Sequence, residues 1–84
     1  MVIKKQYIYG KYHEVKVEAG TISEFFENLS QVPEFSHVAN SQELREFFCR
    51  WFDDTLAGVS PDEEEEIFNR FLKSGLIMII NKDS

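Results

Sequence analysis

The sequence predicts a single α+β domain whose elements follow the order β-β-α-α-α-β, with three helices packed on a small sheet. Three observations support this prediction. Residues 1–19 are rich in β-branched and aromatic side chains, three later segments repeat apolar residues at helical spacing, and a short apolar run follows the last helix stop. A chain of 84 residues has room for one small core, so we expect one domain over residues 1–84.

Residues 1–19 are predicted to form a β-hairpin with Gly10 and Lys11 at the centre of its turn. Glycine at the first central position suits a two-residue type II′ turn. The register stays open. A two-residue turn pairs Tyr9 with Tyr12. A three-residue turn puts Ile3, Val15 and Val17 on one face of the hairpin. A slip of one residue exchanges the faces, so the pattern does not decide which tyrosines are buried.

A first helix is expected over residues 21–32, because Thr21 and Glu24 have the spacing of a capping box. In this box the threonine hydroxyl accepts from a backbone N–H of the first turn, and the glutamate reaches back. Pro33 is expected to end the helix. Its apolar stripe consists of Ile22, Phe25, Phe26, Leu29 and Val32.

A second helix is expected over residues 41–57, since Asn40 and Glu43 repeat the capping box and Gly58 follows as a stop signal. Its apolar stripe is broad. The stripe consists of Leu44, Phe47, Phe48, Trp51, Phe52, Thr55 and Leu56.

A third helix is expected over residues 61–74, with Ser60 as its cap, Pro61 at the first helical position and Glu63 as the box partner. Gly75 ends it. Its apolar stripe consists of Ile67, Phe68, Phe71 and Leu72.

The apolar run after the third helix predicts a last strand over residues 76–81. A strand without polar alternation is typical of one that is buried on both faces. We therefore expect it to be an inner strand of the sheet beside the hairpin.

The formal charge of −6 is concentrated in the middle of the chain. Residues 21–66 carry −10, whereas residues 1–20 and residues 67–84 carry +2 each. A field of this sign repels nucleic acids and anionic lipids and attracts basic partners. The expected partner is therefore a protein with a basic surface.

Five consecutive acidic residues, Asp62 to Glu66, stand at the head of the third helix. Carboxylates there are stabilised by the helix dipole and by unpaired N–H groups, so a solvated helix start explains part of the run. Five adjacent like charges also repel one another, which leaves a binding role open. If the polar sides of the second and third helices lie adjacent, they form one acidic contact face. Its predicted members are Glu43, Glu46, Asp53, Asp54, Asp62, Glu65 and Glu66.

The hairpin offers an alternative surface, because it interleaves lysines with tyrosines. Such a combination stacks on bases while neutralising phosphates, but tyrosine also suits strands and lysine also protects sheet edges. Nucleic acid is not the expected partner, since the local charge of +2 adjoins a segment of −10. The residues of this alternative surface are Lys4, Lys5, Tyr7, Tyr9, Lys11 and Tyr12.

The second helix has a heavy aromatic load at residues 47–52, more than one core-facing stripe needs. An uncovered part of it, or an open sheet edge, would form an oligomer or partner interface. The sequence therefore leaves monomer and homodimer open.

Catalytic and metal-binding motifs are not found in the sequence. His13 and His37 have no ligand spacing around them, and contiguous glutamates lack the alternate spacing of a calcium loop. Cys49 is expected to be inert, because Glu46 and Asp53 flank it and oppose thiolate formation. We expect no catalytic residues, no metal and no cofactor.

The chain contains no apolar run near the ~20 residues of a membrane span and no recognisable secretory signal. We therefore expect a cytoplasmic protein without a membrane partner. The predicted function is that of a small, acidic, non-enzymatic protein-binding module, such as an inhibitor or immunity-type protein that blocks a basic nucleic-acid-handling partner. The alternatives are a nucleic-acid-associated regulator that uses the hairpin, and a structural subunit that oligomerises through the aromatics of the second helix.

Overall fold

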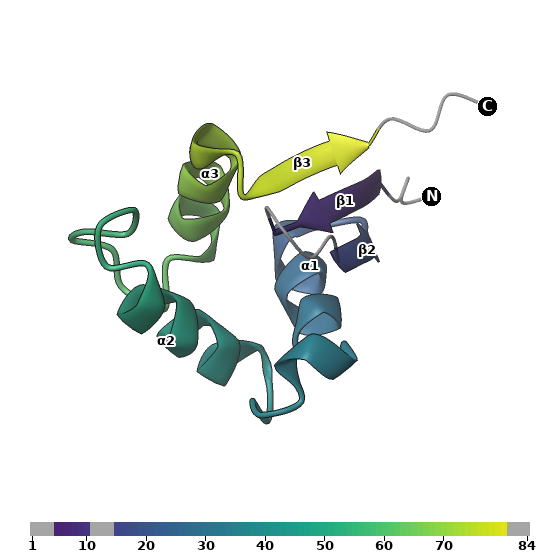
Figure 1. The fold of residues 1–84 in the computed structure, drawn as a ribbon, viewed down its shortest axis with the longest axis horizontal. Helices are drawn as coiled ribbons and strands as arrows, with labels where there is room; N and C mark the ends of the chain where they lie inside the picture. Colours follow the sequence, from purple (N-terminus) through teal and green to yellow (C-terminus); the bar gives the residue numbers. More distant parts are fainter. Residues whose placement is uncertain (1–4, 11–14, 81–84) are drawn as a thin grey trace.

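The computed structural model describes residues 5–10 and 15–80, and it has the predicted order β-β-α-α-α-β. This confirms the α+β fold class. Figure 1 shows the sheet at the upper right and the helices below it and to its left. The elements are β1 (Lys5–Tyr9), β2 (Val15–Ala19), α1 (Ile22–Leu29), the 3₁₀ turn η1 (Pro33–Phe35), α2 (Ser41–Trp51), α3 (Glu64–Ser74) and β3 (Ile77–Ile80).

The three strands form an antiparallel sheet in the order β2-β1-β3. Tyr9 pairs with Val15, so the connection spans residues 10–14, and of the registers left open the two-residue turn, which would pair Tyr9 with Tyr12, is excluded. The turn itself, at residues 11–14, lies outside the described residues. The register follows the alternation of β2, in which buried Val15 and Val17 flank exposed Lys16.

The last strand, β3, lies at an edge of the sheet, which corrects the prediction of an inner strand. The central position belongs to β1, in which neighbouring Tyr7 and Ile8 are both buried. In β3 only Ile77 is fully buried, while Met78 and Ile79 are exposed. An apolar run shows that a strand is hydrophobic, but it does not show how many strands lie beside it.

The helices begin close to the predicted caps but are shorter than predicted. The Thr21 hydroxyl accepts from the N–H of Glu24 at 3.1 Å, and Asn40 caps α2 in the same way with a distance of 2.9 Å to the N–H of Glu43. Helix α1 ends at Leu29 and not at residue 32, and α2 ends at Trp51 and not at residue 57. In both cases the apolar spacing continues through turns that follow the helix.

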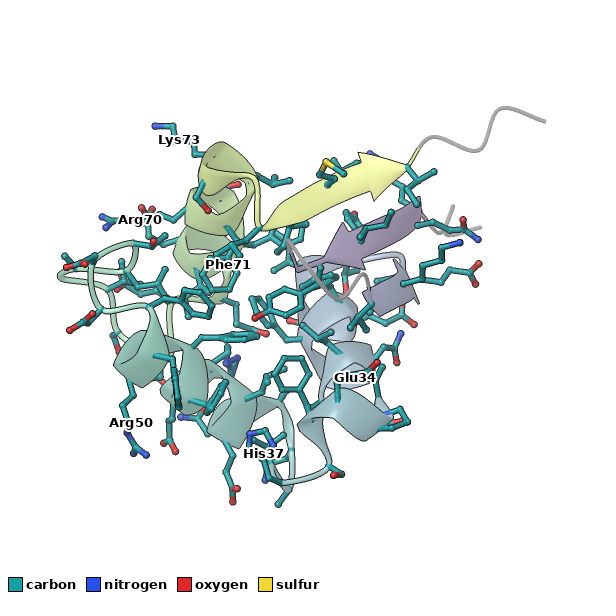
Figure 2. All side chains as sticks on the ribbon, viewed as in Figure 1. Glu34, His37, Arg50, Arg70, Phe71 and Lys73 are labelled. Carbon is teal, nitrogen blue, oxygen red and sulfur yellow. The ribbon has the colours of Figure 1, made fainter. Side chains whose placement is uncertain are left out.

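The core lies between the sheet and the three helices and is dominated by aromatic rings. Phe48 of α2 and Phe71 of α3 meet edge to face with ring centroids 5.0 Å apart, and Tyr7 of β1 meets Phe25 of α1 at 5.2 Å. Figure 2 shows Phe71 pointing inward, while Arg70 and Lys73 of the same helix point outward. The largest fully buried side chains are Phe25, Phe26, Phe48, Phe71, Leu29, Leu44, Ile67 and Ile77.

Candidate functional site

The acidic run is divided between a turn and the first turn of α3. The predicted helix start at residue 61 is three residues early, because residues 60–63 form a turn. The N–H of Ser60 donates to the Glu63 carboxylate at 2.7 Å, and the N–H of Asp62 donates to the Ser60 hydroxyl at 3.3 Å. The predicted Ser60–Glu63 pair therefore forms, but it closes a turn ahead of the helix.

Glu64 connects α3 to both other helices. One carboxylate oxygen lies 3.0 Å from Nη1 of Arg45 on α2, and the other accepts from the hydroxyl of Ser23 on α1 at 3.1 Å. The Arg45 side chain is only 10% exposed. Burial in a low-dielectric region makes such a pair costly to break from one side. Glu64 thereby holds the start of α3, and with it the acidic run, next to α1 and α2.

The contacts of Arg45 continue along α2. Its Nη2 donates to Gln42 Oε1 at 2.8 Å, and Gln42 Nε2 donates to Glu46 at 3.3 Å. This network was not predicted from the sequence, which indicated no specific role for Arg45. The available signal was its position directly after Leu44, at the border of the apolar stripe, where a long side chain can lie along the core.

Glu66 forms an i, i+4 ion pair with Arg70, in which Nε and Oε2 are 2.9 Å apart. Arg70 also donates from Nη1 to the carbonyl oxygens of Ala57 at 2.9 Å and Thr55 at 3.3 Å. This arginine therefore holds the segment after α2 against α3.

An open hollow of about 480 Å³ lies between the start of α1 and the start of α3. Residues 62–66 line one side, Ile22 and Ser23 line the other, and Asn69 contributes from the next turn of α3. We call this region the acidic hollow. Glu63, Glu64 and Glu66 have the partners described above, whereas the carboxylates of Asp62 and Glu65 form no hydrogen bond or ion pair with a described residue. The hollow therefore holds two free carboxylates.

The predicted acidic face is brought together only in part. Asp62, Glu65 and Glu66 line the hollow, but its second wall is α1 and not α2. Helix α2 meets α3 through Phe48 and Arg45 and not through its acidic side. Four of the predicted acidic residues do not line the hollow: Glu43, Glu46, Asp53 and Asp54. Glu43 accepts from the N–H of Ala39 at 3.2 Å, Glu46 accepts from Gln42, and Asp53 and Asp54 are exposed.

The hairpin surface is not available as predicted. Tyr7 is buried between Phe25 and Phe68, and Tyr9 packs on the core ring of Phe48 with centroids 5.4 Å apart. Burial raises the pKa of Tyr9 to about 12. Tyr7 therefore belongs to the core and Tyr9 packs against it, so neither ring is free to stack on bases. Lys5 is exposed, and Lys4, Lys11 and Tyr12 lie outside the described residues.

The aromatic load of α2 is only partly in the core. Trp51 is 68% exposed and lies against Phe47 with ring centroids 5.6 Å apart, and Phe47 packs on His37 at 5.0 Å. Phe48 is fully buried. The aromatic side chain that the core leaves uncovered is therefore Trp51, at the C-terminal end of α2.

Cys49 is half-buried beside the turn that leads into α3, with Sγ 3.6 Å from the carbonyl oxygen of Val59. Its pKa is raised, first by burial and then by the negative charge of Glu63, while Arg45 acts in the opposite direction. A raised pKa lowers the thiolate fraction at neutral pH and with it the nucleophilic reactivity.

Within residues 5–10 and 15–80, no cluster of histidine, cysteine and acidic side chains is arranged to hold a metal ion. His13, the second histidine considered above, lies outside the described residues. In the same part of the chain, none of the helices has the length and apolarity that crossing a membrane requires. No family model matches this chain, and no curated protein or solved structure matches it either.

Proposed function

We propose that this protein is a non-enzymatic binding module that contacts a basic protein partner through the acidic hollow. The observation that carries this proposal is the pair of free carboxylates, Asp62 and Glu65, in a hollow between the starts of α1 and α3. Within this class we favour a cytoplasmic inhibitor or immunity-type protein that blocks a nucleic-acid-handling partner, because basic surfaces that bind phosphates would also bind here.

The charge balance of the hollow favours a cation. Five carboxylates are opposed by two arginines, Arg45 and Arg70, and by the positive end of the α3 dipole. Because that end is worth roughly half a charge, about two and a half negative charges remain uncompensated. Glu64 and Glu66, on either side of Glu65, are engaged in ion pairs, so the uncompensated charge lies on Asp62 and Glu65.

The walls of the hollow suit a long basic side chain. The methylene stem of lysine or arginine can lie on apolar surface while its charged head reaches carboxylates. Ile22 offers such a surface on the α1 side, and Ser23 and Asn69 add polar groups. The proposed contact is thus a lysine or arginine of the partner inserted between α1 and α3.

The proposal is tested by fluorescence anisotropy with a labelled, short lysine- and arginine-rich peptide as the probe. The variant Asp62→Asn with Glu65→Gln removes two charges from the hollow and keeps the shapes of the side chains. The matched control, Asp53→Asn with Asp54→Asn, removes two charges after α2. We expect the hollow variant to bind about tenfold more weakly, which corresponds to about 1.4 kcal/mol, and the control to bind nearly as well as wild type. Equal losses in both variants, or no loss in either, would overturn the proposal.

Inhibition is tested with the same peptide bound to labelled DNA. Addition of the wild-type protein should release the DNA at a lower concentration than addition of the hollow variant does. Release that does not differ between the two proteins would contradict a blocking role of the hollow.

A further inference from the structure

The strand β3 has one free edge. Among the described residues it pairs with β1 alone, and Figure 1 shows it along the upper margin of the sheet. The strand carries no charged residue from Leu76 to Ile80. Proteins usually protect an edge strand with charges, proline or a bulge, because its open N–H and C=O groups can pair with another strand.

The hydrogen-bond pattern identifies the residues that face this edge. In an antiparallel pair, opposite residues alternate between hydrogen-bonded and non-hydrogen-bonded positions. The N–H of Gly10 donates to the carbonyl of Leu76 at 2.9 Å, so Leu76 occupies a hydrogen-bonded position toward β1. Met78 then also faces β1. Ile77 and Ile79 must direct their backbone groups away from β1, toward the free edge.

Side-chain exposure points to the same strand. The large apolar side chains that are exposed among the described residues are Trp51, Met78 at 54% and Ile79 at 44%. Met78 and Ile79 are adjacent in a strand, so they point to opposite faces of the sheet. A partner that lies on one face would cover only one of them. A strand added at the edge covers both.

The opposite edge of the sheet is protected. Lys16 and Glu18 of β2 are exposed charged residues, and Asn28 of α1 donates from Nδ2 to the carbonyl of Glu18 at 2.7 Å. This carbonyl is therefore already hydrogen-bonded. The two edges of one sheet thus differ in both charge and backbone pairing.

We propose that β3 pairs antiparallel with β3 of a second copy of this chain across a twofold axis at Met78. A second copy suits this edge, because an axis at Met78 pairs isoleucine with isoleucine on both sides of it and brings no charged side chain into the contact. The twofold axis puts Ile77 opposite Ile79 of the second copy in a hydrogen-bonded position, as the outward backbone groups require. It puts the two Met78 residues opposite each other and joins the sheets as β2-β1-β3-β3-β1-β2.

The electrostatics allow this pairing. Each chain has a formal charge of −6, but the strand from Leu76 to Ile80 is uncharged. Two copies therefore meet there without like charges in the contact. A second copy also supplies the apolar strand that covers Met78 and Ile79 on both faces of the sheet.

A cross-link tests the geometry most sharply. In a non-hydrogen-bonded antiparallel position, opposite Cα atoms lie about 4.5 Å apart, which is within the range of a disulfide. The full-length chain with Cys49→Ser and Met78→Cys should therefore form a covalent dimer almost completely under mild oxidation with glutathione. The matched control, Cys49→Ser with Lys16→Cys on the protected edge, should stay mainly monomeric. Equal cross-linking of the two variants would overturn the proposal, and so would no cross-linking of the Met78→Cys variant.

Sedimentation equilibrium provides a second readout without a covalent bond. The wild-type chain should form dimers that dissociate on dilution from several hundred micromolar to low micromolar concentrations. Met78→Lys and Ile79→Lys should each make it monomeric without lowering its helix content, because both side chains are exposed. A monomeric wild type at several hundred micromolar would contradict the pairing, and so would a lysine variant that associates as strongly as wild type.

Discussion

The acidic hollow and the free edge of β3 belong to the same small fold, but they offer a partner opposite kinds of contact. The hollow presents the free carboxylates of Asp62 and Glu65, whose attraction to a cation is long-range and screened by salt. The edge presents the backbone groups of Ile77 and Ile79 together with exposed apolar surface. Salt screens neither of these. The two surfaces can therefore be altered one at a time.

The difference arises from how each element is stabilised. Carboxylates at a helix start are stabilised locally, by the dipole and by ion pairs such as Arg70 with Glu66. An apolar strand is stabilised only by what packs beside it, and β3 has such a neighbour on one side. The start of α3 can therefore keep unpaired carboxylates for a partner. Strand β3, which has no neighbour on one side, keeps unpaired backbone groups.

The largest effect is expected from Arg45→Ala, which breaks the polar network under the hollow and leaves β3 unchanged. The free energy of unfolding should fall by about 2–3 kcal/mol, because Glu64 loses its buried partner but keeps some contact with water. Urea denaturation measures this loss. The control Arg70→Ala removes a more exposed pair and should cost about 1 kcal/mol.

Equal losses for the two arginine variants would contradict the role of burial at Arg45. Because Arg45 lies under the hollow and away from β3, Arg45→Ala also provides a test of whether the two surfaces are independent. Below its unfolding temperature, this variant should dimerise through β3 as strongly as wild type, which sedimentation equilibrium can measure.

A salt series should change the affinity of the hollow for the peptide but scarcely the affinity of β3 for its copy, and this effect is smaller than the stability loss of Arg45→Ala. Raising the salt concentration from roughly 0.05 M to roughly 0.5 M shortens the Debye length about threefold. Binding of the basic peptide should weaken by about tenfold or more. Dimerisation should stay constant or strengthen slightly, because the charge of −6 on each copy is screened. If the two affinities fell together, the proposed difference between the surfaces would be wrong.

The smallest effect at neutral pH concerns Tyr9, on the inner face of the sheet, because its contribution changes only in alkali. Burial raises the pKa of Tyr9 from 10.0 to about 12. Between these values the folded chain binds more protons than the unfolded chain, so stability falls as the pH rises through this window. Urea titrations at several pH values above 9 measure the decline. Tyr9→Phe should make it shallower, and an unchanged decline would show that other groups cause it.

The starts of the first two helices could be predicted from the sequence, because caps are local. Thr21 and Asn40 bind the first-turn N–H groups as their spacing indicates. The ends of α1 and α2 could not be predicted, since the apolar stripe continues through turns. Leu56 is buried after α2 has ended, and its N–H donates to the carbonyl of Phe52 at 2.7 Å.

Features that depend on tertiary neighbours were outside the reach of the sequence. The negative charge of residues 62–66 could be predicted from the sequence. That α1 forms the other wall of the hollow could not, because the packing of the helices decides it. The burial of Arg45 and the edge position of β3 are of the same kind. In each case one segment indicates chemical character, and the fold decides what lies beside it.

The central claim, that the acidic hollow is the contact surface, is tested most directly by nuclear magnetic resonance. The isotope-labelled full-length chain is titrated with the lysine- and arginine-rich peptide, and the backbone amide shifts are followed residue by residue. We predict that the largest changes occur at Ser23, at residues 62–66 and at Asn69, which line the hollow. Changes centred on Glu46, Asp53 and Asp54, or no changes at saturating peptide, would contradict the account.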